Sequence, residues 1–107
     1  MVYLVSGGKH QPTHDLSAIQ AACSDGKTLN ITGSAIRDAA AAGYGSSEIV
    51  EVIQSIQARH FHKTMASEKV PGLWQDVYRV PSGELELYVK FTSDIVTEFK
   101  LLSFKER

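Results

Sequence analysis

Two neighbouring segments in the C-terminal half constrain the fold of this chain most. Residues 85–91, LELYVKF, alternate strictly between apolar and polar side chains, which is typical of a strand with one buried face. Residues 74–80, WQDVYRV, are rich in aromatic and branched side chains, and the intervening PSGE is turn-forming. We therefore expect an antiparallel hairpin whose inward side chains are Leu85, Leu87, Val89 and Phe91 and whose outward ones include Glu86, Tyr88 and Lys90.

Helical patterns fill the first half of the chain. The first predicted helix is capped by Thr13 or Asp15, carries Leu16, Ile19 and Cys23 at helical spacing, and stops at Gly26. The second spans residues 35–42 after a cap at Thr32 or Ser34, with an apolar stripe of Ile36, Ala39 and Ala40. Both are interpreted as scaffold that packs against another element.

The third predicted helix is the longest. Ser46 or Ser47 caps it, and its apolar face consists of Ile49, Val52, Ile53 and Ile56. Helix or helical turn is expected to continue from Arg59 through Met65, with Phe61 and Met65 toward the core and Lys63 turned away from it. His60 and His62 are two apart, so at most one of them would face the same site as Lys63.

A third strand is expected over Ile95–Phe104, apolar on both faces as a central strand would be. Three antiparallel strands after three helices predict an α+β fold with N-terminal helices packed on a C-terminal antiparallel sheet. The 107 residues, 43% hydrophobic, suit one domain over the whole chain. Residues 1–9 are interpreted as an arm or a short edge strand.

Charge and cysteine content narrow the function classes. The net charge of −1 provides no general field for nucleic acid, although the part after Gln57 has 8 basic and 7 acidic residues, so an anion site must be local. No apolar run is long enough for a signal peptide or a membrane span, and we expect a cytoplasmic protein. The single cysteine, Cys23, excludes an intrachain disulfide, and no metal or cofactor is expected.

The register of the hairpin decides which polar side chains meet. A three-residue loop would place Asp76 opposite Tyr88 and turn Gln75 to the other face. A four-residue loop would pair Gln75 with Lys90, Val77 with Tyr88 and Arg79 with Glu86. We favour the second because it sets opposite charges against each other across the strands. It gathers Gln75, Arg79, Tyr88 and Lys90 on one face, and the predicted site requires Gln75 and Tyr88 to share that face.

These side chains suit chemistry on a phosphodiester. A ribonuclease without metals drives the ribose 2′-hydroxyl onto the adjacent phosphorus, which needs a proton acceptor, donors to the phosphoryl oxygens and an acid for the leaving oxygen. Lysine or tyrosine could exchange protons, Arg79 and Lys90 could hold phosphate, and Gln75 could bond phosphate or a base. An exposed lysine and tyrosine on a sheet are more often simply solvated.

The segments FHKTM, WQDVYR, LYVKF and SFKER, in this order and spacing, resemble the MqsR family of toxins from the MqsR/MqsA toxin-antitoxin systems. The likeness extends upstream through PTHDLS to about Gln11. It implies a RelE-like fold and an endoribonuclease that cleaves messenger RNA at short sequences without the ribosome. It also implies a cognate protein antitoxin as partner.

The resemblance implies catalytic roles for Lys63, Gln75 and Tyr88, and an RNA contact for the C-terminal Lys105. Strand geometry adds Arg79 and Lys90 to the RNA-binding set. His62 stands where some relatives carry tyrosine, so it could alter RNA contacts or supply an additional titrating group. Residues 1–9 have no counterpart in the family pattern.

Two alternatives stay open. A ribosome-dependent nuclease of the wider RelE type must dock on ribosomal RNA, which the near-neutral net charge disfavours. A non-catalytic toxin-like protein could instead pair with a partner and regulate transcription. No helix with clustered Lys or Arg is recognisable as a DNA reader, so we expect no direct DNA binding by this chain alone.

Overall fold

The computed structural model describes residues 8–9, 11–68, 70–93 and 95–104. Three helices precede most of the sheet in sequence: α1 (Leu16–Ala22), α2 (Gly33–Ala41) and α3 (Ser46–Ser55), followed by a short 3-10 helix, η1 (Ala58–His60). The strands are β1 (Gly8–Lys9), β2 (Phe61–Ala66), β3 (Trp74–Ser82), β4 (Leu85–Thr92) and β5 (Ile95–Phe104). The α+β class with helices before the main strands is confirmed.

The strands form one antiparallel sheet in the order β1-β2-β3-β4-β5. Gly8–Lys9 forms the short edge strand expected in this region, whereas Met1 to Val5 lie outside the described residues. The prediction that Ile95–Phe104 is a central strand is wrong, because β5 is the other edge. Its side chains Val96 and Phe99 are apolar because they are buried in the core, and the backbone of Asn30 and Thr32 bonds to Val96 along this edge.

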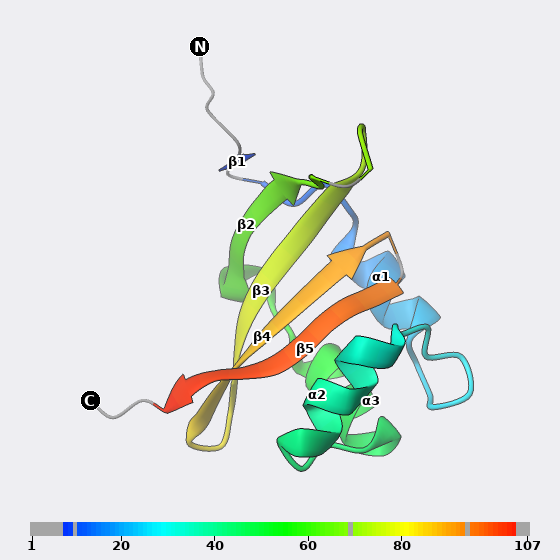
Figure 1. Cartoon of the computed structure of the whole chain (residues 1–107), viewed down its shortest axis with the longest axis vertical. Helices are drawn as coiled ribbons and strands as arrows, with labels where there is room; N and C mark the ends of the chain where they lie inside the picture. The colour runs from blue at the N-terminus through cyan, green and yellow to red at the C-terminus, as the bar shows by residue number, and fades with distance from the viewer. Residues whose placement is uncertain (1–7, 10, 69, 94, 105–107) are drawn as a thin grey trace.

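The core lies between the three helices and one face of the sheet (Figure 1). Every predicted apolar residue of α3 is buried, and so are Ile19 and Cys23 of the first helical segment. On β4 the predicted alternation is confirmed, with Leu87, Val89 and Phe91 fully buried. On α2 the predicted stripe is confirmed only at Ala39, which is buried with Ala35, whereas Ile36 is 46% exposed and Ala40 is also exposed.

The observed helix caps follow simple chemistry. Asp15 caps α1 by accepting the Ser17 N–H at 3.0 Å, and Thr32 caps α2 by accepting the Ala35 N–H at 3.2 Å. The predicted serine cap of α3 is wrong, because Gly45 occupies the N-cap position and its N–H is bonded by the Glu48 carboxylate at 3.0 Å.

The prediction of helical structure from Arg59 to Met65 is wrong. Helix α3 ends at Ser55, and Phe61–Ala66 forms β2 between β1 and β3. Phe61 packs against the core as expected, with its ring 5.6 Å from that of Tyr78. Met65 instead pairs with Gln75 and lies on the other face. Pairing with two strands overrides the local helical pattern.

A tertiary cap explains where α3 stops. The amide of Gln20, on α1, donates to the carbonyls of Ile53 and Ile56 at 3.0 and 2.9 Å. In return, the Gln54 amide donates to the Gln20 and Cys23 carbonyls at 2.7 and 3.2 Å. The last carbonyls of both helices are therefore satisfied by side chains from the opposite helix, and neither helix needs a glycine stop.

We expect Gln20→Ala to lower the free energy of unfolding by about 1–2 kcal/mol, because it leaves part-buried α3 carbonyls without donors. Chemical denaturation followed by circular dichroism measures this. Gln11→Ala, at an exposed position before α1, is the matched control and should leave stability unchanged. Equal stability of the two variants would show that water replaces the Gln20 cap.

Candidate functional site

The helices leave one face of the sheet uncovered, here called the open face. Because side chains alternate along each strand, the residues between the core positions point to this face. Its described members include Lys63, Met65, Gln75, Val77, Arg79, Glu86, Tyr88, Lys90 and Glu98. Gln75 and Tyr88 share this face, as the predicted site requires.

The hairpin register differs from both predicted registers. Ser82 pairs with Leu85, so the turn has two residues, and Gly83 takes a positive φ of 62° that glycine adopts without strain. Val77 lies opposite Lys90 rather than Tyr88. The shift from the favoured register is an even number of residues, so every side chain keeps its predicted face while the cross-strand pairs change.

Lys63 and Tyr88 lie close enough to act on one phosphodiester. Lys63 pairs with Val77, and Tyr88 pairs with Arg79 two residues further along β3. Strand spacing then separates their Cα atoms by about 12 Å, a gap that two long side chains can close around a bound group. Val77 has no exposed surface, so it forms the floor between them.

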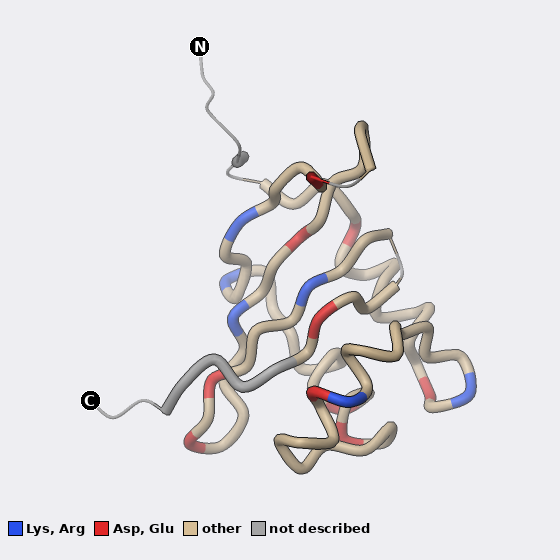
Figure 2. Tube along the Cα trace, viewed as in Figure 1, with Lys and Arg blue, Asp and Glu red and all other residues tan. Residues whose placement is uncertain are grey.

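Two ion pairs neutralise part of the charge on the open face. Arg79 donates to both carboxylate oxygens of Glu86, at 3.1 and 3.0 Å, which is the attractive pair predicted from the sequence although Tyr88 is the directly opposite residue. The Lys90 ammonium lies 3.6 Å from Glu98, with 13% of its side chain exposed. Figure 2 shows basic positions on β2, β3 and β4 interspersed with acidic ones.

Among the described cations of the open face, Lys63 has the least compensated charge. Its side chain is exposed, and among the described residues it forms no ion pair. An exposed ammonium with three donors is suited to anionic oxygen atoms. Among the described residues, Lys63 is therefore the candidate for a local anion contact on this face.

The pKa values of Tyr88 and His62 are shifted in directions that bear on proton transfer. Burial, and secondarily the charge of Glu98, raises the pKa of Tyr88, which keeps its phenol protonated at neutral pH. Partial burial, followed by the charges of Arg79 and Lys63, lowers the pKa of His62, with Glu86 opposing. His62 is therefore a neutral imidazole beside Lys63 and Arg79.

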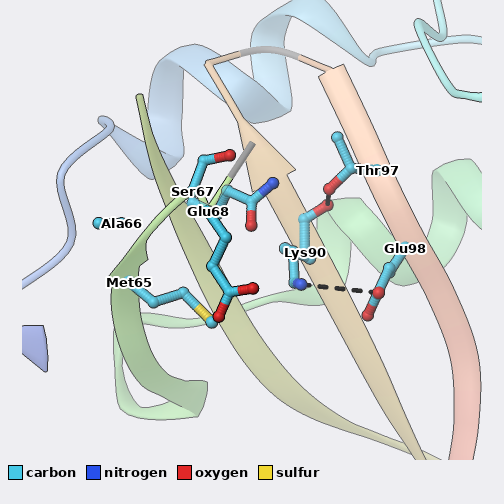
Figure 3. Close-up of a pocket in the computed structure, with 8 residues that line it drawn as sticks. Met65, Ala66, Ser67, Glu68, Lys90, Thr97 and Glu98 are labelled. Atoms are coloured by element: carbon cyan, nitrogen blue, oxygen red, sulfur yellow. Dashed lines mark hydrogen bonds and ion pairs between the residues drawn. The ribbon is translucent and has the colours of Figure 1, made fainter. Parts of the chain in front are cut away.

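A pocket of about 400 Å³ opens at the Gln75 end of this face (Figure 3). Its lining includes the thioether of Met65, the amide of Gln75 and the Lys90–Glu98 pair, with Glu68 from the β2–β3 loop. Apolar and polar groups of this kind, in a pocket of this size, suit a small planar ligand.

Most of the predicted site residues lie together. Lys63, Gln75, Arg79, Tyr88 and Lys90 all belong to the open face. The expectation that His62 shares a helix with Lys63 is wrong, since both are on β2, but His62 does lie beside Lys63 and Arg79. His60 belongs to η1, where its Nδ1 accepts the Gln57 N–H at 2.9 Å. Lys105 lies outside the described residues.

Sequence reasoning missed the role of Asp76. Its carboxylate is fully buried and accepts the Thr13 and His14 N–H groups at 3.0 and 2.8 Å. The His14 imidazole also lies 3.0 Å from the Trp74 carbonyl. An acidic residue at a position that shares its face with the buried Tyr78 and Val80 was the available signal. Through these hydrogen bonds, Asp76 holds the segment before α1 against β3, the strand that contains Gln75 and Arg79.

Among the described residues, no three His, Cys, Asp or Glu side chains are grouped to hold a metal ion. In the same part of the chain, no helix has the length and apolarity needed to cross a bilayer.

Comparison with known proteins identifies the family of this chain. A search of curated proteins finds no match. The sequence model of the family described as "Motility quorum-sensing regulator, toxin of MqsA" matches residues 11–106, nearly the whole chain. The match begins where the resemblance was expected to begin, and its description supports an MqsA-type antitoxin as partner. The chain belongs to the MqsR family, the toxins of the MqsR/MqsA toxin-antitoxin systems.

Proposed function

We propose that this toxin is an endoribonuclease that cleaves single-stranded mRNA at short sequences, without a metal ion or the ribosome, and that its antitoxin neutralises this activity. The observation that carries the proposal is the grouping of Lys63, Gln75, Arg79 and Tyr88 on one exposed sheet face. A single domain over residues 1–107 would carry the activity, and an RNA contact by Lys105 stays a prediction.

The reaction would follow from the positions of these groups. A base takes the proton of the ribose 2′-hydroxyl while O2′ bonds to phosphorus and the bond from phosphorus to O5′ breaks. The Lys63 ammonium would hold the non-bridging oxygens as their charge grows. Tyr88, protonated because of its raised pKa, would donate its proton to the leaving O5′. The products are a 2′,3′-cyclic phosphate and a 5′-hydroxyl.

Sequence preference would come from the pocket beside Gln75. An amide can both donate to and accept from a base edge, and the Met65 thioether offers a contact for the base ring. We expect Gln75→Ala to lower kcat/KM at the preferred sequence roughly 10-fold and to weaken the preference among sequences. Cleavage of a randomised RNA pool measures both, with Gln11→Ala as control. An unchanged preference would remove Gln75 from recognition.

The decisive test uses the purified toxin separated from its antitoxin, a defined RNA and excess EDTA. Cleavage at a recurrent short sequence with 2′,3′-cyclic phosphate ends is the expected result. Cleavage that requires added ribosomes would identify the RelE-type alternative. If the RNA stays intact under both conditions while the purified toxin still binds its antitoxin, the result would favour a binding-only protein.

A further inference from the structure

A β-bulge interrupts β2 at the end nearest Arg79. Phe61 pairs with Tyr78, but Lys63 pairs with Val77, so β2 contains one residue more than β3 in this interval. Residues two apart on a strand normally share a face. Here Phe61 packs on the helix side against Tyr78, whereas Lys63 lies on the open face. His62 is the residue at which β2 changes face.

Three charged side chains lie near enough to the His62 imidazole to act on its charge. Lys63 on β2, Arg79 on β3 and Glu86 on β4 all act on it electrostatically. Arg79 and Glu86 are bonded to each other, so His62 lies beside this pair. The side chain of His62 is exposed, and a substrate held by Lys63 can reach it.

The proton acceptor of the proposed reaction must have a lone pair available at neutral pH. The Lys63 ammonium and the Arg79 guanidinium are donors only. Both carboxylate oxygens of Glu86 accept hydrogen bonds from Arg79, and Lys90 pairs with Glu98. The raised pKa of Tyr88 assigns its phenol to proton donation. Among the described groups at this end of the face, the neutral imidazole of His62 is the acceptor that is not held in an ion pair.

We propose that His62 is the catalytic base that removes the proton from the attacking ribose 2′-hydroxyl, an assignment that rests on the ribonuclease function proposed above. The proton passes from O2′ to the imidazole as the O2′–P bond forms, and Tyr88 protonates O5′ as the P–O5′ bond breaks. Proton exchange with water then returns His62 and Tyr88 to their starting forms. The charge of Glu86 favours the transient imidazolium, whereas those of Lys63 and Arg79 oppose it.

The pH dependence of kcat/KM tests this assignment. For the wild-type toxin, kcat/KM should fall tenfold per pH unit below the pKa of His62, which lies under 6.5, because protonation removes the acceptor. His62→Asn and His62→Gln should each lower kcat/KM about 10²-fold at pH 7.5. In both variants the fall of kcat/KM at low pH, here called the acidic limb, should disappear. Added imidazole should restore part of the lost rate, an effect that a merely structural histidine would not show.

His60→Asn is the matched control. His60 is two residues away, and burial followed by the charge of Arg59 also lowers its pKa, but it belongs to η1 and is bonded to the Gln57 N–H. This variant should keep the acidic limb. Circular dichroism and thermal melting identify any variant that does not fold. If one His62 variant fails to fold, the other is used for the test.

Two results would overturn the assignment while leaving the ribonuclease proposal in place. One is a folded His62 variant that cleaves within threefold of the wild type and keeps the acidic limb. The other is a large loss of rate in which the limb remains and imidazole restores nothing. Absence of RNA cleavage by the wild-type toxin under every condition would remove both proposals.

Discussion

The Lys63→Ala/Tyr88→Ala double variant should lose about 10²–10⁴-fold of kcat/KM for RNA cleavage while melting within a few degrees of the wild type. Loss of a donor to the developing phosphoryl charge costs about 10²–10³-fold, and loss of a general acid about 10²–10⁴-fold. The two losses need not multiply, because both groups act on the same transition state. Lys63 is exposed and Tyr88 lies on the open face, so neither supports the core.

The measurement combines cleavage of a defined RNA with growth of cells that express the toxin without antitoxin. Lys27→Ala removes an exposed lysine in the loop between α1 and α2 and should leave both unchanged. Tyr88→Phe removes the hydroxyl but keeps the ring. It should show most of the loss of kcat/KM that Tyr88→Ala causes. If the double variant still stops growth while RNA stays intact, toxicity arises from binding and not from cleavage.

Asp76→Ala should produce the largest loss of stability among single substitutions at polar residues of this sheet. The carboxylate is fully buried and accepts two backbone N–H groups, from Thr13 and His14. Hydrogen bonds to a charged acceptor contribute about 1.5–3 kcal/mol each, so the expected loss is roughly 3–6 kcal/mol. For a domain of this size that lowers Tm by about 12 °C or more.

Thermal melting followed by circular dichroism checks this expectation. Asp76→Asn keeps one acceptor oxygen but sets its amide N–H against a backbone donor, so it should fall between alanine and the wild type. Asp38→Ala, at an exposed position of α2, is the control and should melt within about 2 °C of the wild type. A similar Tm for Asp76→Ala would mean that the Thr13 and His14 N–H groups find other acceptors.

The face on which each hairpin residue lies could be predicted from the sequence. Side chains alternate with a period of two, and burial of one face makes that alternation visible in LELYVKF. The pairing across the hairpin could not be predicted, because it depends on the turn. Pro81 was expected to begin the loop but belongs to β3. Proline is tolerated there because β2 pairs with β3 only as far as Tyr78, leaving that edge open beside Pro81.

The sequence by itself determined the α+β class, the three helices with the caps of α1 and α2, and the grouping of Gln75, Arg79, Tyr88 and Lys90 on one face. These features depend on local periodicity and cap chemistry. Only the tertiary structure decided that residues 61–66 form a strand. It also decided that Gln20 ends α3 and that a bulge turns Lys63 outward beside His62. Each depends on a partner distant in the chain, and short-range patterns contain no information about such partners.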